Sequence, residues 1–138
     1  MSSPIMPVAK SIFLCDDVLY DSSTGKIHMI GVFNAIRVKS PATYPFRPKQ
    51  LCVVGQFIGG MGDYSFRVEI TDPAAGEGIY SVVAGVLRFP TRHTSVYACV
   101  RITECVFPGP GDYVVEMYVN DLFIEDRLLI LLGEESAS

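Results

Sequence analysis

Tyr64-Ser-Phe-Arg-Val-Glu-Ile70 alternates strictly between apolar or aromatic side chains and polar ones. Because successive side chains of a strand point to opposite faces, this period of two predicts a strand with one face on a core and one in water. Residues 113–119 repeat the scheme, with the odd-numbered residues facing inward. No segment with the helical period is long enough to form a crossover helix, so the pattern favours an all-β protein.

Four further runs are apolar on both alternations and rich in β-branched and aromatic residues, which predicts strands covered on two faces. Asn120-Asp121 predicts a tight hairpin turn because both residues tolerate positive φ. Three prolines in residues 40–49 exclude a central strand there and indicate a crossing connection. The sequence therefore predicts an antiparallel β-sandwich of about eight strands. The four runs are residues 26–39, 51–58, 79–89 and 96–107.

A chain of 138 residues that is 49% hydrophobic and 19% charged is expected to fold as one domain with its own core. We assign this domain to residues 11–133, with an N-terminal extension at residues 1–10 and a polar tail at residues 134–138. The start lacks the basic and apolar regions of a secretory signal, and no window reaches the ~20 apolar residues of a membrane span. We therefore expect a cytoplasmic protein.

The charge balance argues against a nucleic-acid partner, because the net charge is −4 and the pI is near 5.0. One local basic cluster brackets the proline-rich connection. We interpret it as solvated charge around a loop, with nucleic-acid contact as the less favoured alternative. The cluster consists of Arg37, Lys39, Arg47 and Lys49.

A short internal echo precedes the two alternating strands. Gly62-Asp63-Tyr64 leads one of them and Gly111-Asp112-Tyr113 leads the other. In Greek-key sandwiches a tyrosine just inside a strand can hydrogen-bond back across the corner. We predict that both tyrosines are corner or core residues, with ligand stacking as the alternative.

The cysteines and histidines give no catalytic pattern. We interpret the four cysteines as buried small hydrophobic residues, and their spacing does not match a zinc site. His28 lies in an apolar strand and suggests a core or interface histidine, whereas His93 lies in a polar loop. We expect no enzyme activity and no cofactor, with a cysteine-dependent hydrolase as the alternative. The four cysteines are Cys15, Cys52, Cys99 and Cys105, of which Cys15 or Cys99 would be the nucleophile.

Asp16-Asp17 interrupts an apolar run, so one of the two carboxylates should point toward the apolar side. A bulge or a charge-protected edge strand is one explanation. A cation site, or a buried polar contact to a partner, is the other. A calcium-type site would also need the loop acids, which we expect to lie at different ends of the sandwich. These acids are Asp21, Asp63, Asp72, Glu77, Asp112 and Asp121.

The apolar residues exceed what two inner sheet faces can use, and the mean hydropathy is +0.33. Surplus apolar surface marks interfaces. We therefore predict a non-enzymatic protein that acts by protein–protein contact, as a homo-oligomer or as a subunit of a larger assembly. The alternative is a ligand- or cation-binding sandwich. The interface candidates are Ile30, Val32, Val54, Tyr118, Phe123, Leu129 and Leu131.

Several motifs resemble a bacterial family of short, uncharacterised single-domain proteins. They are Leu14-Cys-Asp-Asp-Val18, Gly25-Lys26, Ile30-Gly-Val-Phe33, residues 64–73 and Pro110-Gly-Asp-Tyr113. The resemblance covers nearly the whole chain and implies a single immunoglobulin-like β-sandwich with no assigned activity. It supplies no catalytic or binding residues.

Overall fold

The computed structural model describes residues 5–38 and 44–133, which form ten strands. Within these ranges no helix is long and apolar enough to cross a membrane. The strands are β1 (Val8–Cys15), β2 (Asp17–Asp21), β3 (Lys26–Ile30), β4 (Ala35–Val38), β5 (Leu51–Ile58), β6 (Gly62–Asp72), β7 (Glu77–Phe89), β8 (Val96–Ile102), β9 (Gly111–Val119) and β10 (Leu122–Gly133).

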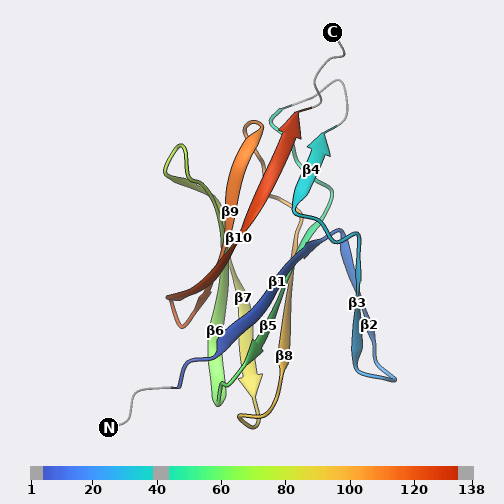
Figure 1. Cartoon of the computed structure of the whole chain (residues 1–138), viewed down its shortest axis with the longest axis vertical. Coiled ribbons are helices and arrows are strands. Elements are labelled where there is room, and N and C mark those ends of the chain that lie inside the picture. The colour runs from blue at the N-terminus through green and yellow to red at the C-terminus, as the bar shows by residue number, and fades with distance from the viewer. Residues whose placement is uncertain (1–4, 39–43, 134–138) are drawn as a thin grey trace.

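Two sheets pack face to face as a sandwich, and a separate hairpin projects from its side (Figure 1). One sheet has the order β1-β5-β8 and the other has the order β4-β10-β9-β6-β7. The hairpin consists of β2 and β3. Along one margin β1 approaches β10, and along the other β7 approaches β8, so the two layers are in contact at both edges.

The two strands of period two supply much of the core, as predicted. β6 buries Tyr64, Phe66, Val68 and Ile70, and β9 buries its odd-numbered residues from 113 to 119. The rings of Phe66 and Phe57 meet edge to face with centroids 5.5 Å apart, which joins the two sheets. The alternating pattern therefore records the contact between the layers.

Both Gly-Asp-Tyr tyrosines are buried at corners, which confirms the prediction. The Tyr64 hydroxyl accepts a hydrogen bond from the Met61 N–H at 2.9 Å. The Tyr113 hydroxyl donates to the Gly109 carbonyl at 2.6 Å. Each hydroxyl thus satisfies backbone groups in the turn that precedes its own strand.

The fold class is confirmed, but the count is ten strands rather than about eight. The expected single strand at residues 26–39 is two strands, because the chain turns at Gly31, whose φ is +67°. β3 stays with β2, while β4 joins the other sheet beside β10. That pairing is parallel, which corrects the prediction of a purely antiparallel sandwich. β1 begins at Val8, within the segment expected to be an extension.

The hairpin covers the outer side of β1 and β5 and forms a second, small core there. This corrects the interpretation of the apolar surplus, because part of it is used within the chain. Val54, an interface candidate, is fully buried in this core, and Leu129 and Leu131 are buried in the main core, so these three residues are not surface residues. The small core consists of Cys15, Val18, Cys52 and Val54, with Phe13, Ile27 and Met29 packed against it.

Candidate functional site at the hairpin junction

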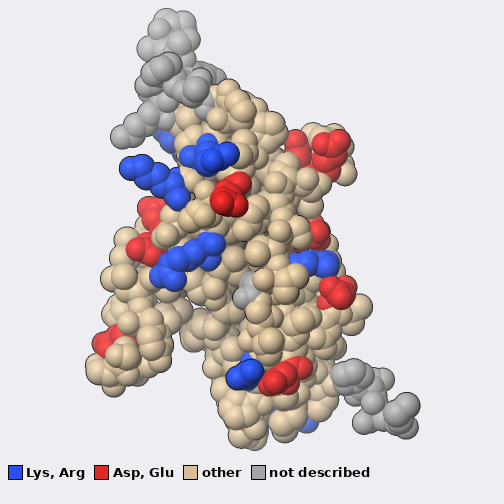
Figure 2. Space-filling view, turned by 180° about the vertical axis from the view of Figure 1, so that it is seen from behind, with Lys and Arg blue, Asp and Glu red and all other residues tan. Residues whose placement is uncertain are grey.

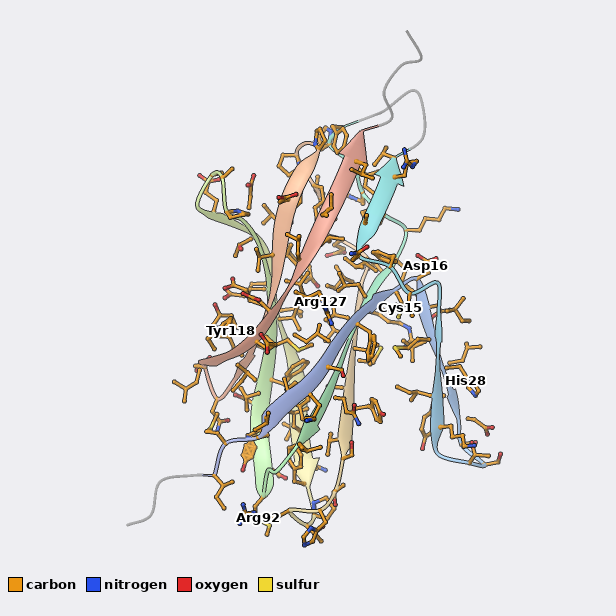
Figure 3. The ribbon with its side chains drawn as sticks, in the orientation of Figure 1. Cys15, Asp16, His28, Arg92, Tyr118 and Arg127 are labelled. Carbon is orange, nitrogen blue, oxygen red and sulfur yellow. The ribbon has the colours of Figure 1, made fainter. Side chains whose placement is uncertain are left out.

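Asp16 and Asp17 lie where β1 ends and the hairpin begins (Figure 3). Asp16 forms a bend, and its N–H donates to the Ile30 carbonyl at 2.9 Å. Asp17 is the first residue of β2 and pairs with Ile30 across the hairpin. The expected bulge or protected edge strand is therefore a junction between two strands that belong to different sheets.

Asp17 ties the hairpin to the sandwich. Its Oδ1 accepts the Val18 N–H at 2.7 Å and the Gln50 amide at 3.0 Å. Arg101 of β8 lies 3.5 Å from the same oxygen and also donates to the Val18 carbonyl. These groups lower the pKa of Asp17, chiefly the Val18 N–H, then the Gln50 amide and the Arg101 charge. Asp17 thus makes a polar contact, with its partners inside the chain.

Asp16 directs its carboxylate over Gly31 at the other end of the hairpin. A Cβ atom at Gly31 would lie 2.3 Å from Asp16 Oδ2, so any larger residue at this position would force the Asp16 side chain to move. The positive φ of Gly31 requires glycine independently. The two residues together set the angle at which the chain leaves the hairpin.

A cleft of about 590 Å³ opens beside this junction, between β4 and the connection that leads to β5. We call it the β4 cleft. Most of its lining is apolar, with one acid, one base and one amide at its borders. It is lined by Asp16, Gly31, Val32, Phe33, Ala35, Ile36, Phe46, Pro48, Lys49 and Gln50.

Three cysteines gather on the outer side of the β1-β5-β8 sheet. Cys15 of β1 lies opposite Cys52 of β5 in the strand register, and Cys99 lies on the next strand, β8. Burial raises the pKa of all three thiols, to about 12 for Cys52, and raises that of Cys105 in the main core to about 12. All four are free thiols. Burial is confirmed for three of them, but Cys99 is an exposed residue.

The hairpin exposes apolar side chains. His28 is also exposed on it, which corrects the expectation of a core position (Figure 3). We call the apolar group the hairpin patch. It comprises Leu19, Tyr20, Ile30 and Val32, with exposed fractions of 52%, 68%, 46% and 56%.

Two other interface candidates lie on the outer face of the five-stranded sheet. Phe123 is exposed and Tyr118 is half-buried, with ring centroids 6.0 Å apart. The Arg67 guanidinium lies 4.3 Å from the Tyr118 ring centre and 2.9 Å from Asp121. Tyr118 is therefore partly covered by its own neighbours.

The loop acids serve local roles. Asp21 accepts the Ser23 N–H at 2.9 Å, and Asp72 accepts the Ala74 N–H at 3.1 Å. Asp63 lies 3.7 Å from Arg88. Asp72 and Asp112 line one hollow of about 450 Å³. Among residues 5–38 and 44–133, no three His, Cys, Asp or Glu residues are grouped to hold a metal ion.

The partners of Asp17 at the junction were not predicted from the sequence. Gln50 and Arg101 are 33 and 84 residues from Asp17, so only the fold brings them together. A signal was present, because Arg101 interrupts an apolar strand and an acid pointing toward an apolar side needs a counter-charge. Of the basic cluster, Arg37, Arg47 and Lys49 are exposed, and Lys39 lies outside the described residues.

These features define an immunoglobulin-like β-sandwich with an added hairpin. Residues 10–131 match the sequence pattern of DUF6941, a family of unknown function, and the chain belongs to this family. The expectation of an uncharacterised immunoglobulin-like family is confirmed at that level.

Two solved structures are similar to the chain to different degrees. A crystal structure of an immunoglobulin-like protein from Pseudomonas aeruginosa is similar with 14% identity and a TM-score of 0.50, covering 95% of this chain and 100% of that one. The sensor domain of the anti-sigma factor RsgI4 in Pseudobacteroides cellulosolvens has 13% identity and a TM-score of 0.39, covering 64% and 81%. No curated protein matches the sequence.

Proposed function

We propose that the protein is a non-enzymatic module that acts by protein–protein contact, and that its partner at the hairpin is a second copy of the chain. One observation carries this proposal, which is that the hairpin projects from the sandwich and exposes the four apolar side chains of the hairpin patch (Figure 1). Leu19 and Ile30 lie on the same outward face of the hairpin, and exposed apolar surface of this kind marks interfaces.

The geometry of the hairpin favours a second copy as the occupant. Among the described strands, β2 and β3 pair only with each other, so no described strand occupies their outer edges. A two-stranded hairpin is marginally stable in water and gains from additional strands. Two hairpins related by a two-fold axis would pair edge to edge into one four-stranded sheet and bring the outward apolar side chains of the two copies side by side.

The thiols support a non-enzymatic role. Burial raises the pKa of Cys15 and of Cys99, so neither residue is largely thiolate at neutral pH, whereas nucleophilic cysteines have lowered pKa values.

Sedimentation velocity over a concentration series tests the proposal. We expect a concentration-dependent dimer, and we expect the double variant Leu19→Ser, Ile30→Ser to be monomeric. The matched control is Val83→Ser, Val86→Ser, which removes two exposed apolar residues from β7 instead. A monomer at about millimolar concentration, or a dimer that the hairpin variant leaves intact, would overturn self-association through this patch.

A further inference from the structure

The open edge of β4 offers backbone groups to a ligand. β4 pairs with β10 on one side, and no described strand lies on the other. The Ile130 N–H donates to the Asn34 carbonyl at 2.9 Å, so Asn34 faces β10. Because backbone groups alternate along a strand, those of Ala35 and Arg37 face the open edge. This edge is a template for one more strand.

The β4 cleft lies beside this same edge. Ala35 and Ile36 form one wall, and Phe46 and Pro48 of the connection to β5 form the other. Its volume of about 590 Å³ falls within the range of ligand pockets. A strand added to β4 would point every second side chain toward this apolar cleft.

The charges around the cleft select the ligand. Arg37, Arg47 and Lys49 are exposed, and the ion pairs among the described residues involve none of them. In Figure 2, Lys and Arg side chains gather on the side of the molecule where β4 and the connection lie. Asp16 lines the cleft itself, and its negative charge repels an acidic side chain of a ligand there. Acidic side chains therefore fit at the rim, and apolar ones fit inside.

We propose that the β4 edge and the β4 cleft bind an extended segment of a partner protein in which acidic and apolar residues alternate. The segment adds to the sheet as a sixth strand beside β4. Its apolar side chains enter the cleft, and its carboxylates lie near Arg37, Arg47 and Lys49. The open edge of β4 is separate from the edges of β2 and β3, and the inference does not depend on self-association, although Val32 borders both the β4 cleft and the hairpin patch.

Fluorescence anisotropy with labelled, end-blocked peptides tests the proposal. The probe is an eight-residue peptide of alternating glutamate and valine at low salt. One control peptide replaces glutamate by lysine. A second control carries N-methyl groups on alternate backbone nitrogens, which removes the donors that a strand uses. We expect the first peptide to bind and both controls to bind at least about tenfold more weakly.

Three variants locate the site. Ala35→Pro removes the outward N–H of β4 without touching the bonds to β10, and we expect it to abolish binding. Arg37→Glu changes only an exposed side chain and should weaken binding about five- to tenfold, so it keeps the test valid if the proline variant does not fold. The matched control is Arg92→Glu, which lies in the connection between β7 and β8, at one end of the molecule and away from Asp16 (Figure 3).

The outcomes separate this proposal from its competitors. Loss of binding in the β4 variants, with binding kept in Arg92→Glu and in Leu19→Ser, Ile30→Ser, supports it. No binding at about millimolar peptide, equal binding of the lysine peptide, or full binding by Arg37→Glu overturns it. A single-stranded oligonucleotide that displaces the peptide shows a nucleic-acid site instead and also overturns it.

Discussion

Asp17 connects three parts of the junction, because one carboxylate oxygen joins β2 to the segment before β5 and to β8. Alternation along the strand predicts that one acid of the Asp16-Asp17 pair points toward the apolar side. The identity of its partners follows from the topology of the sheets, and the local sequence pattern does not predict it. A single sequence therefore predicts that this acid needs a partner, but not which residue is the partner.

The pH dependence of Asp17 follows from its lowered pKa. Folding moves this pKa below its ordinary value of 3.8, so the carboxylate stabilises the fold above that pH and loses its contribution as pH falls through the folded value. We expect Asp17→Asn to unfold at lower urea than wild type at about pH 7, with a difference that shrinks below pH 3.8.

Asp16→Asn is the matched control for that series. It changes a neighbouring carboxylate that accepts no hydrogen bond from a described group, and we expect its urea midpoint to stay near wild type. A difference between Asp17→Asn and wild type that is constant with pH would contradict the role given to the ionised carboxylate.

Gly31→Ala tests the close approach between Gly31 and Asp16. The left-handed backbone alone costs a non-glycine residue about 1–2 kcal/mol. The contact with Asp16 Oδ2 adds to this, because the new Cβ atom would lie 2.3 Å from it. We expect the second change, Asp16→Ala, to recover only the part of the unfolding free energy that is lost to the contact with Asp16. A double-mutant cycle of unfolding free energies should therefore give a coupling of about 0.5 kcal/mol or more. Strictly additive effects would show that the two residues do not meet.

Among the elements, the regular strands were predictable and the points where the chain changes sheets were not. β5 was predicted with its observed bounds, and β6 and β9 with their buried faces. The break between β3 and β4 was missed because Ile30 and Val32 continue the apolar run on both sides of Gly31. A period of two indicates which face of a strand is covered, but it does not indicate which sheet the strand joins.

The hairpin is expected to open independently of the sandwich. Its inner face packs on a small core, so Val18→Ala, which removes two buried carbon atoms, should cost about 1.5 kcal/mol. In hydrogen exchange of the Val18→Ala variant, we expect the amides of β2 and β3 to exchange faster than in wild type. The amides of β6 and β9 should exchange at the wild-type rate.

Leu19→Ala is the control for this exchange experiment, because Leu19 faces outward on the same strand. It should leave hairpin exchange nearly as in wild type at concentrations where the protein is monomeric. Equal acceleration in the hairpin and in β9 would show that both belong to one cooperative unit.

For the molecule as a whole, the reactivity of the Cys105 thiol measures global unfolding, because Cys105 lies in the main core. Cys15, Cys52 and Cys105 are buried, and the pKa values of Cys52 and Cys105 are raised to about 12. In the native protein at about pH 8, we expect Ellman's reagent to modify Cys99 alone, and slowly, because its pKa is also raised.

Cys105 lies in the main core and should react only as the whole protein unfolds, at a rate that follows the population of the unfolded state. Cys15 and Cys52 lie in the small core under the hairpin and should react whenever the hairpin opens. Cys99→Ser should abolish the reaction of the folded protein with Ellman's reagent and leave the reactions of the other three thiols unchanged. Rapid modification of more than one thiol in the folded protein would contradict the packing of the two cores.

The parallel pairing of β4 with β10 has a consequence for synthesis. β4 is made early. β10, which pairs with β4 and also contacts β1, leaves the ribosome far later. Such long-range pairing slows folding, and a nascent chain meanwhile exposes the faces that β10 will cover. The sandwich therefore closes only after β10 has emerged, and until then a chaperone has access to its unpaired strands.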